Sequence, residues 1–187
     1  MAAAQAFGDA EYAKLDALTV AVPNPEAMAA LLSGGTGSGV NSNFTAPPYS
    51  NEALANPKIK TVLTAYDVLG GSTVLDVVWA TSKFRQANPR TFEAFLAALK
   101  DSIAFINKNK AAAARIYIEM QGKSYSEKHV LEILNASNQG IPDVEFTLDP
   151  KRITKYSDFL HKTGRLPIRP SSWKDMFFPN AHDLVGS

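Results

Sequence analysis

The arrangement of hydrophobic and polar positions changes near Phe84. Before this residue, short runs rich in β-branched and apolar residues are separated by turns that contain proline and glycine. That pattern is typical of β-strands. After Phe84, apolar residues recur at every third or fourth position, which is typical of amphipathic helices. The pattern predicts four strands: Leu15–Val22, Val40–Ala46, Lys58–Tyr66 and Thr73–Ala80.

Short helices are predicted between these strands. The first is the alanine-rich stretch at 2–7. Asn24 is a suitable N-cap for a second helix at 25–32, which begins with a proline. A further helical turn is predicted at 51–54. This alternation, together with a run at 73–80 that is apolar enough to be buried on both faces, predicts an α/β fold with a largely parallel sheet.

Four longer helices are predicted in the second half of the chain. The first begins at Asn88-Pro89 and carries a regular apolar stripe. A second is predicted at 110–121, and a third follows Ser124 with capping-box spacing to Glu127. A fourth begins at Asp149-Pro150, and the tail after it is held by an aromatic cluster. The stripe of the first helix comprises Phe92, Phe95, Leu96, Leu99, Ile103 and Ile106.

Composition restricts the possible functions. The chain has 187 residues, with 19 Lys and Arg against 18 Asp and Glu, so its formal net charge is +1. No basic patch is visible, which argues against nucleic acid as a partner. Cysteine is absent, which removes thiolate metal sites and a cysteine nucleophile. No apolar run is long enough to span a bilayer.

The predicted ligand contacts lie at the ends of the strands, where parallel α/β sheets bind ligands. Asn24 follows the first strand, Asn43 and Thr45 belong to the second, and Tyr49 forms a possible wall. A turn at 70–73 precedes the long apolar run and adds Gly71 and Ser72. These residues supply carboxamides, hydroxyls and backbone amides but neither a strong base nor a nucleophile. The inventory predicts a binding site and not an enzyme, with no cofactor and no metal.

Other motifs carry weaker hypotheses. The GGTGSG loop at 34–39 lacks the lysine and the following helix of a phosphate-binding loop, so a surface turn accounts for it better. The three histidines share no motif. Asp67 and Asp76 flank the 70–73 turn and could act as an acid and a base, or could anchor the loop, which is the commoner role of such residues.

Five segments in order resemble the periplasmic solute-binding proteins of ABC importers, in the nitrate, taurine and aliphatic-sulfonate group. The segments are AALLSGG, NFTAPPY, YDVLGG, VVWATSKF with NPRTFEAFLAAL, and PSSWKDMFFPNAHDL. The resemblance covers the whole chain. It implies two α/β lobes of the type II periplasmic-binding-protein kind, a ligand held in the cleft between them, and delivery to an ABC permease in the inner membrane.

The resemblance also assigns roles along the chain. Residues 1–72 would be part of the second lobe, 73–84 the returning crossover strand and hinge, and 85–187 a helical segment and tail that pack on the first lobe. Gly71 and Ser72 would lie at the hinge and face the cleft. The ligand would be a small anion or polar solute such as a sulfonate, taurine or nitrate, and the complete protein a periplasmic monomer.

Two departures from the family pattern bear on these expectations. The family carries histidine where this chain has Asn24 and Asn43, so its ligand preference would differ. The chain also lacks the signal peptide and most of the first lobe, which suggests a truncated copy with partly uncovered apolar stripes. Two alternatives therefore stay open: the effector-binding domain of a transcription regulator, and a non-functional fragment. A relationship to thiamine-pyrimidine synthases is disfavoured because the chain has no cysteine.

Overall fold

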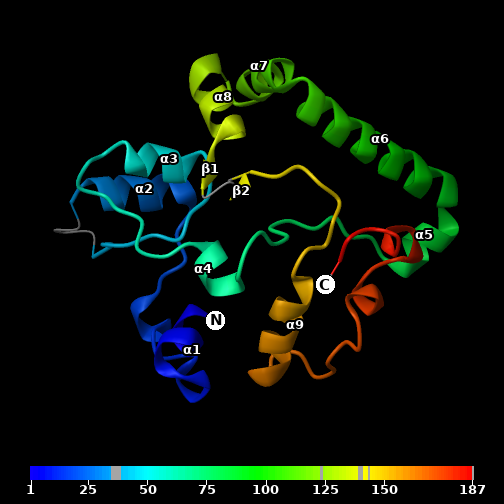
Figure 1. The fold of residues 1–187 in the computed structure, drawn as a ribbon, viewed down its shortest axis with the longest axis horizontal. Helices are drawn as coiled ribbons and strands as arrows, with labels where there is room; N and C mark the ends of the chain where they lie inside the picture. The colour runs from blue at the N-terminus through cyan, green and yellow to red at the C-terminus, as the bar shows by residue number, and fades with distance from the viewer. Residues whose placement is uncertain (35–38, 123, 139–140, 143, 187) are drawn as a thin grey trace. The chain divides into compact units, whose positions relative to one another are not determined.

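The computed structural model describes residues 1–34, 39–122, 124–138, 141–142 and 144–186. Most of the GGTGSG loop, residues 35–38, lies outside this part of the chain. The structure divides into two compact units, Met1–Gly71 and Ser72–Ser187. Figure 1 shows the helices and strands of both units.

Unit 1 consists of short helices joined by extended segments. Its elements are α1 (Ala2–Phe7), η1 (Asp9–Glu11), η2 (Asp16–Leu18), α2 (Asn24–Leu32), α3 (Tyr49–Leu54) and α4 (Ala65–Leu69). The helices predicted at 2–7, 25–32 and 51–54 are all present, with α3 starting two residues earlier than expected. The predicted N-cap of α2 is wrong, because Asn24 is its first residue and the cap is Pro23.

The core of unit 1 is small. Helices α2 and α3 pack together and bury Ala27, Met28 and Ala53 (Figure 1). Elsewhere in the unit, Ala3 of α1 and Leu69 of α4 are also buried. Because three of these five side chains are alanines, most of the buried apolar surface comes from Met28 and Leu69.

Helix α4 has strong local end signals. The Thr64 hydroxyl accepts a hydrogen bond from the backbone N–H of Asp67, and the Asp67 carboxylate accepts one from the N–H of Thr64, so the two form a capping box. At the other end, Gly70 adopts a left-handed conformation with φ of 78°, which costs glycine little. These signals explain why 65–69 is helical although the sequence pattern predicted the end of a strand there.

Unit 2 is dominated by one long helix and the shorter helices that follow it. Figure 1 shows α6 leading into α7 through a break at Asn109. The helices are α5 (Ser82–Ala87), α6 (Pro89–Lys108), α7 (Lys110–Met120), α8 (Glu127–Asn135) and α9 (Ile153–Lys162), with short turns η3 (Trp173–Met176) and η4 (Pro179–Ala181). The four predicted long helices are confirmed. However, α8 is capped by Ser126 and not Ser124, and α9 begins three residues after Pro150.

The core of unit 2 lies where α7 packs on α8, burying Ala114, Val130 and Ile133. The stripe on α6 is less well covered than its pattern predicted. No residue of α6 is buried, and 54% of Phe95 is exposed. The tail contacts the start of α6, because Phe178 meets the edge of Phe92 at 5.7 Å between ring centroids. The guanidinium of Arg85 lies over both of these rings.

The predicted α/β fold with a parallel sheet, of the type II binding-protein kind, is wrong. The sheet among the described residues is one antiparallel pair of two-residue strands, β1 (Ser137–Asn138) and β2 (Ile141–Pro142). The four predicted strands are instead extended or irregular segments, with η2 inside the first and the start of α4 at the end of the third.

The predicted strands do not form, because among the described residues no other segment pairs with them. A strand is stabilised by ladder hydrogen bonds and by packing of at least one face. The segment at 73–80 is attached through its first residues, where the Val74 N–H donates to the Lys151 carbonyl at 3.0 Å. Beyond that point its side chains face solvent, with Leu75 78% and Trp79 81% exposed. Its apolar sequence therefore does not correspond to burial.

Candidate functional site

Two of the predicted ligand contacts meet in unit 1. Asn24 is the first residue of α2, and Thr45 lies in the extended segment that leads to α3. The Thr45 hydroxyl donates to the Asn24 side-chain oxygen at 3.4 Å, a long and therefore weak hydrogen bond. The hydrogen bond places these two residues side by side, while their role as ligand contacts stays a prediction.

Asn43, two residues before Thr45, has an unsatisfied side chain. Its Nδ2 atom is shielded from solvent and has no hydrogen-bond partner among the described residues. The same is true of the side-chain oxygen of Asn51 in α3. A buried polar atom without a partner costs about 1–3 kcal/mol, so such groups call for an explanation. Within the described residues, one donor and one acceptor thus remain without a partner.

Asn51 was missed by sequence analysis, which treated 51–54 only as a helical turn. The available signal was the residue type, because asparagine is a poor helix former whose side chain competes for backbone hydrogen bonds. Tyr49, predicted as a possible wall, is the first residue of α3 and is half-buried. Together, Asn24, Asn43, Thr45 and Asn51 form what we call the asparagine cluster.

Gly71 and Ser72 lie at the division between the units. Gly71, the last residue of unit 1, has φ of 132°, a conformation that favours glycine. Ser72 begins unit 2 and donates its hydroxyl proton to the Glu145 carboxylate at 2.9 Å. The Ser72 side chain thus joins two segments of unit 2, a role that the prediction of a ligand contact did not include.

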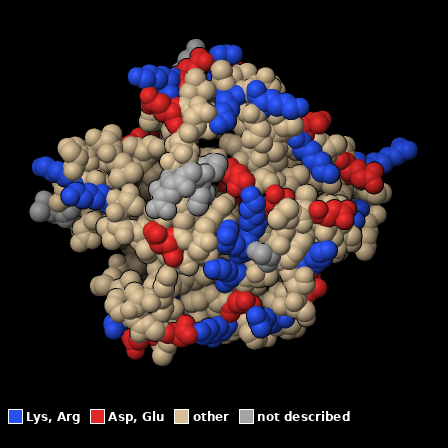
Figure 2. All heavy atoms as spheres, viewed as in Figure 1, with Lys and Arg blue, Asp and Glu red and all other residues tan. Residues whose placement is uncertain are grey.

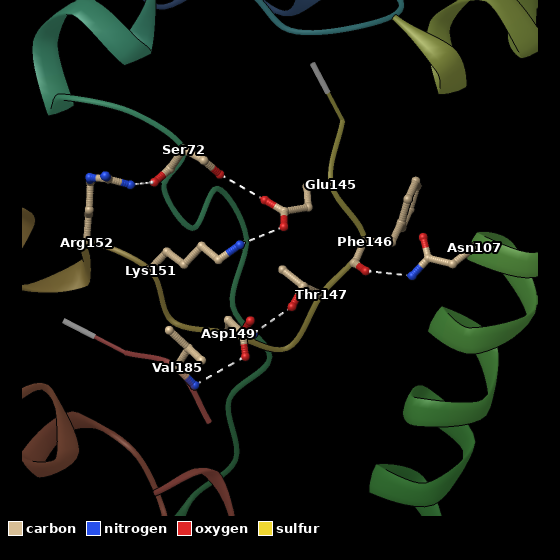
Figure 3. A network of polar contacts seen from close by, with 9 residues as sticks. All are labelled: Ser72, Asn107, Glu145, Phe146, Thr147, Asp149, Lys151, Arg152 and Val185. Carbon is tan, nitrogen blue, oxygen red and sulfur yellow. Dashed lines mark hydrogen bonds and ion pairs between the residues drawn. The ribbon is translucent and has the colours of Figure 1, made fainter. Parts of the chain in front are cut away.

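A polar network fixes the start of unit 2 (Figure 3). Glu145 accepts hydrogen bonds from both Ser72 and Lys151, the latter at 2.6 Å. Arg152 donates to the Ser72 carbonyl, and the hydroxyl of Thr73 donates to the Lys151 carbonyl at 3.2 Å. These contacts attach residues 72–74 to the segment before α9.

Further hydrogen bonds hold the 145–149 segment in place. Asn107 of α6 donates to the Phe146 carbonyl at 3.0 Å (Figure 3). Asp149 accepts a bond from the backbone N–H of Val185 in the tail at 3.3 Å. The segment therefore connects the start of unit 2, α6 and the tail.

Lys151 favours the ionised form of Glu145. Its hydrogen bond is the main cause that holds the pKa of the Glu145 carboxyl below its ordinary value; partial burial opposes this effect and Ser72 reinforces it. A carboxylate with a lowered pKa stabilises the fold at pH values above the ordinary glutamate pKa of about 4.3. That contribution is lost as the pH falls through the lower pKa of the folded state.

Glu145→Gln is therefore expected to reduce the pH dependence of stability on the acidic side. At pH 7 the free energy of unfolding of the variant is expected to be lower than that of the wild type by about 1 kcal/mol or less, because the ion pair is partly exposed. Below about pH 4 the difference from the wild type shrinks. Urea unfolding measured at pH 7 and at pH 3.5 tests this. A difference that stays the same at both pH values would contradict the assigned ion pair.

The other candidate chemical groups have structural roles. The Asp67 carboxylate caps α4, and its hydrogen bonds with Thr64 lower its pKa; Asp76 shows no comparable contact in the described chain. His182 contacts the carbonyls of Lys174 and Phe177, and His161 contacts that of Leu166, each at 3.0 Å. No group of three or more potential metal ligands occurs in the described ranges.

Charge is distributed evenly over the visible surface. Figure 2 shows basic and acidic side chains interspersed on the face drawn, in keeping with the near balance of 19 Lys and Arg against 18 Asp and Glu.

Among the helices of the described residues, none is both long and apolar enough to cross a membrane.

Comparison with models of protein families, with curated proteins and with solved structures finds no match in any of the three.

Proposed function

We propose that this chain binds a small anion or polar solute at the asparagine cluster and acts as the solute-binding component of an ABC importer. The observation that carries the binding site is that the Asn43 nitrogen and the Asn51 oxygen are each shielded from solvent without a hydrogen-bond partner among the described residues. The importer role, with a permease as partner and a periplasmic location, rests on the five segments that resemble the nitrate, taurine and sulfonate group.

The proposed site is independent of the fold that proved wrong. It needs no parallel sheet, because its residues come from α2, α3 and the extended segment between them. A solute with oxygen atoms can accept from the Asn43 amide, and one with an ammonium group, such as taurine, can also donate to the Asn51 oxygen. Each such bond satisfies a group that is otherwise buried without a partner.

Asn43→Leu distinguishes a ligand site from a packing defect. Leucine has the same branched shape and the same number of non-hydrogen side-chain atoms, with no polar atom, so the ligand-free variant is expected to be about 1–3 kcal/mol more stable than the wild type. The variant is also expected to lose the stabilisation by solute. For the wild type this is about 2.7 kcal/mol at a concentration of 100 times the dissociation constant. Thermal unfolding with taurine, nitrate and an alkanesulfonate measures both effects.

Asn41→Leu is the matched control, since Asn41 lies in the same segment but is exposed. It is expected to leave the ligand response unchanged. If none of the solutes stabilises the wild type, or if Asn43→Leu retains the full response, the proposed site is wrong. If a solute binds through Asn43 but the protein does not associate with a permease, only the importer role is lost.

A further inference from the structure

Unit 2 contains a cavity that no part of the proposed function uses. Its volume is about 170 Å³, and it lies among the end of α6, the start of α7, the end of α8 and the 144–146 segment. Its apolar wall includes Ile106, Leu134, Val144 and Phe146. Its polar groups include Lys110 and Asn107.

Lys110 lines this cavity without an ion pair to any of the residues that the structure describes. Its half-buried ammonium donates to the Leu134 carbonyl at 2.7 Å and to the Asn135 side-chain oxygen at 2.9 Å. Both acceptors are neutral, and no ion pair of Lys110 is found among the described residues. Because an ammonium has three donors, one remains after these two bonds.

Glu145, which also lines the cavity, does not neutralise Lys110. Its carboxylate is already paired with Lys151 at 2.6 Å and accepts a bond from Ser72. The hydrogen bonds and ion pairs of the described cavity walls therefore leave one positive charge, that of Lys110, uncompensated beside an apolar surface. A ligand that matches this environment carries one negative charge and a short apolar chain.

We propose that this cavity binds a short-chain monocarboxylate, with its head on the Lys110 ammonium and its chain against the apolar wall. The volume sets the length of the chain. A water molecule takes about 30 Å³ in the liquid, so 170 Å³ accommodates roughly six non-hydrogen atoms. Butanoate has this size. Its carboxylate accepts a charge-assisted hydrogen bond from the spare donor of Lys110, a stronger type of bond than one between neutral groups.

The cavity and the asparagine cluster are separate sites, because every residue that lines the cavity belongs to unit 2. The variant Asn43→Leu is therefore expected to bind butanoate as the wild type does. A negative result at one site therefore leaves the proposal for the other site unaffected, and failure of the cavity proposal can be told apart from failure of the proposed function.

Titration of the full chain with butanoate, followed by NMR through the side-chain amide signals of Asn107 and Asn135, tests the proposal. Butanoate is expected to shift these signals to saturation, with a dissociation constant of about 1 mM. Butanamide has the same shape without the charge, and acetate has the charge without the chain. Each is expected to bind at least about tenfold more weakly than butanoate.

Lys110→Met removes the ammonium and keeps the apolar stem of the side chain. The variant is expected to bind butanoate about tenfold more weakly than the wild type does, at the level of butanamide. Its affinity for butanamide is expected to stay within about twofold of the wild-type value. A purely structural role of Lys110 would weaken both ligands alike. Lys108→Met is the matched control, because Lys108 is exposed and does not line the cavity.

Two results would overturn the proposal. One is an equal affinity of the wild type for butanoate and butanamide. This comparison uses the wild type alone, so it does not depend on whether a variant folds. The other is a set of butanoate shifts that never saturates.

Discussion

Leu69→Ala lowers the free energy of unfolding of unit 1 by about 2–5 kcal/mol. Leu69 is 4% exposed and, with Met28, is one of the two large side chains buried in this unit among the described residues. Shortening it removes apolar contact and leaves a cavity at its buried position. Urea unfolding followed by circular dichroism measures the loss.

Leu75→Ala is the control for this change, since Leu75 is 78% exposed. It makes the same chemical change where little apolar surface is buried and is expected to alter stability by about 0.5 kcal/mol or less. If the two variants are equally stable, the placement of Leu69 in the core is wrong.

Ile133→Ala is expected to have a similarly large effect in unit 2, about 2–5 kcal/mol. Ile133 lies in α8, which packs on α7, and it is 8% exposed. The α7–α8 contact holds the main buried cluster of this unit, so loss of its largest member is expected to lower the melting temperature by about 4 °C or more. Differential scanning calorimetry provides the measurement.

Ile168→Ala serves as the matched control, because Ile168 lies in the tail and is 78% exposed. The melting temperature of the Ile168→Ala variant is expected to stay close to that of the wild type. A drop as large as that of Ile133→Ala would mean that the tail, and not α8, carries the packing of the unit.

The helices were predictable because their signals are local. Gly8 ends α1, Pro89 begins α6, and the apolar spacing of α6 needs no knowledge of the rest of the chain. Small errors arose where several capping residues compete. Ser126 caps α8 although Ser124 has the better spacing to Glu127, because cap choice also depends on where the chain enters the helix.

The strands were not predictable in the same way. A run such as 73–80 has the composition of a buried strand, but a strand exists only when another segment pairs with it. In the described chain this run stays extended with Trp79 81% exposed. The sequence pattern reports which side chains would favour burial, not whether a partner is present to bury them.

The candidate ligand contacts stay a prediction. Asn24 and Thr45 were chosen separately, at the ends of different predicted strands, and the structure joins them by a hydrogen bond. The role of Ser72 was not foreseen, because its partner Glu145 lies 73 positions away along the chain. Asn51 escaped notice because its residue type signals only a poor helix former, and not a side-chain oxygen that is buried without a partner.

The most direct test of the proposed binding site is an NMR titration that follows the side-chain amide signals of Asn43 and Asn41. Taurine, nitrate and an alkanesulfonate are added in turn to the isotope-labelled chain. Binding at the asparagine cluster predicts that at least one solute moves the Asn43 signals to saturation while those of Asn41 stay in place. Asn43 signals that remain unmoved by all three solutes would contradict the account.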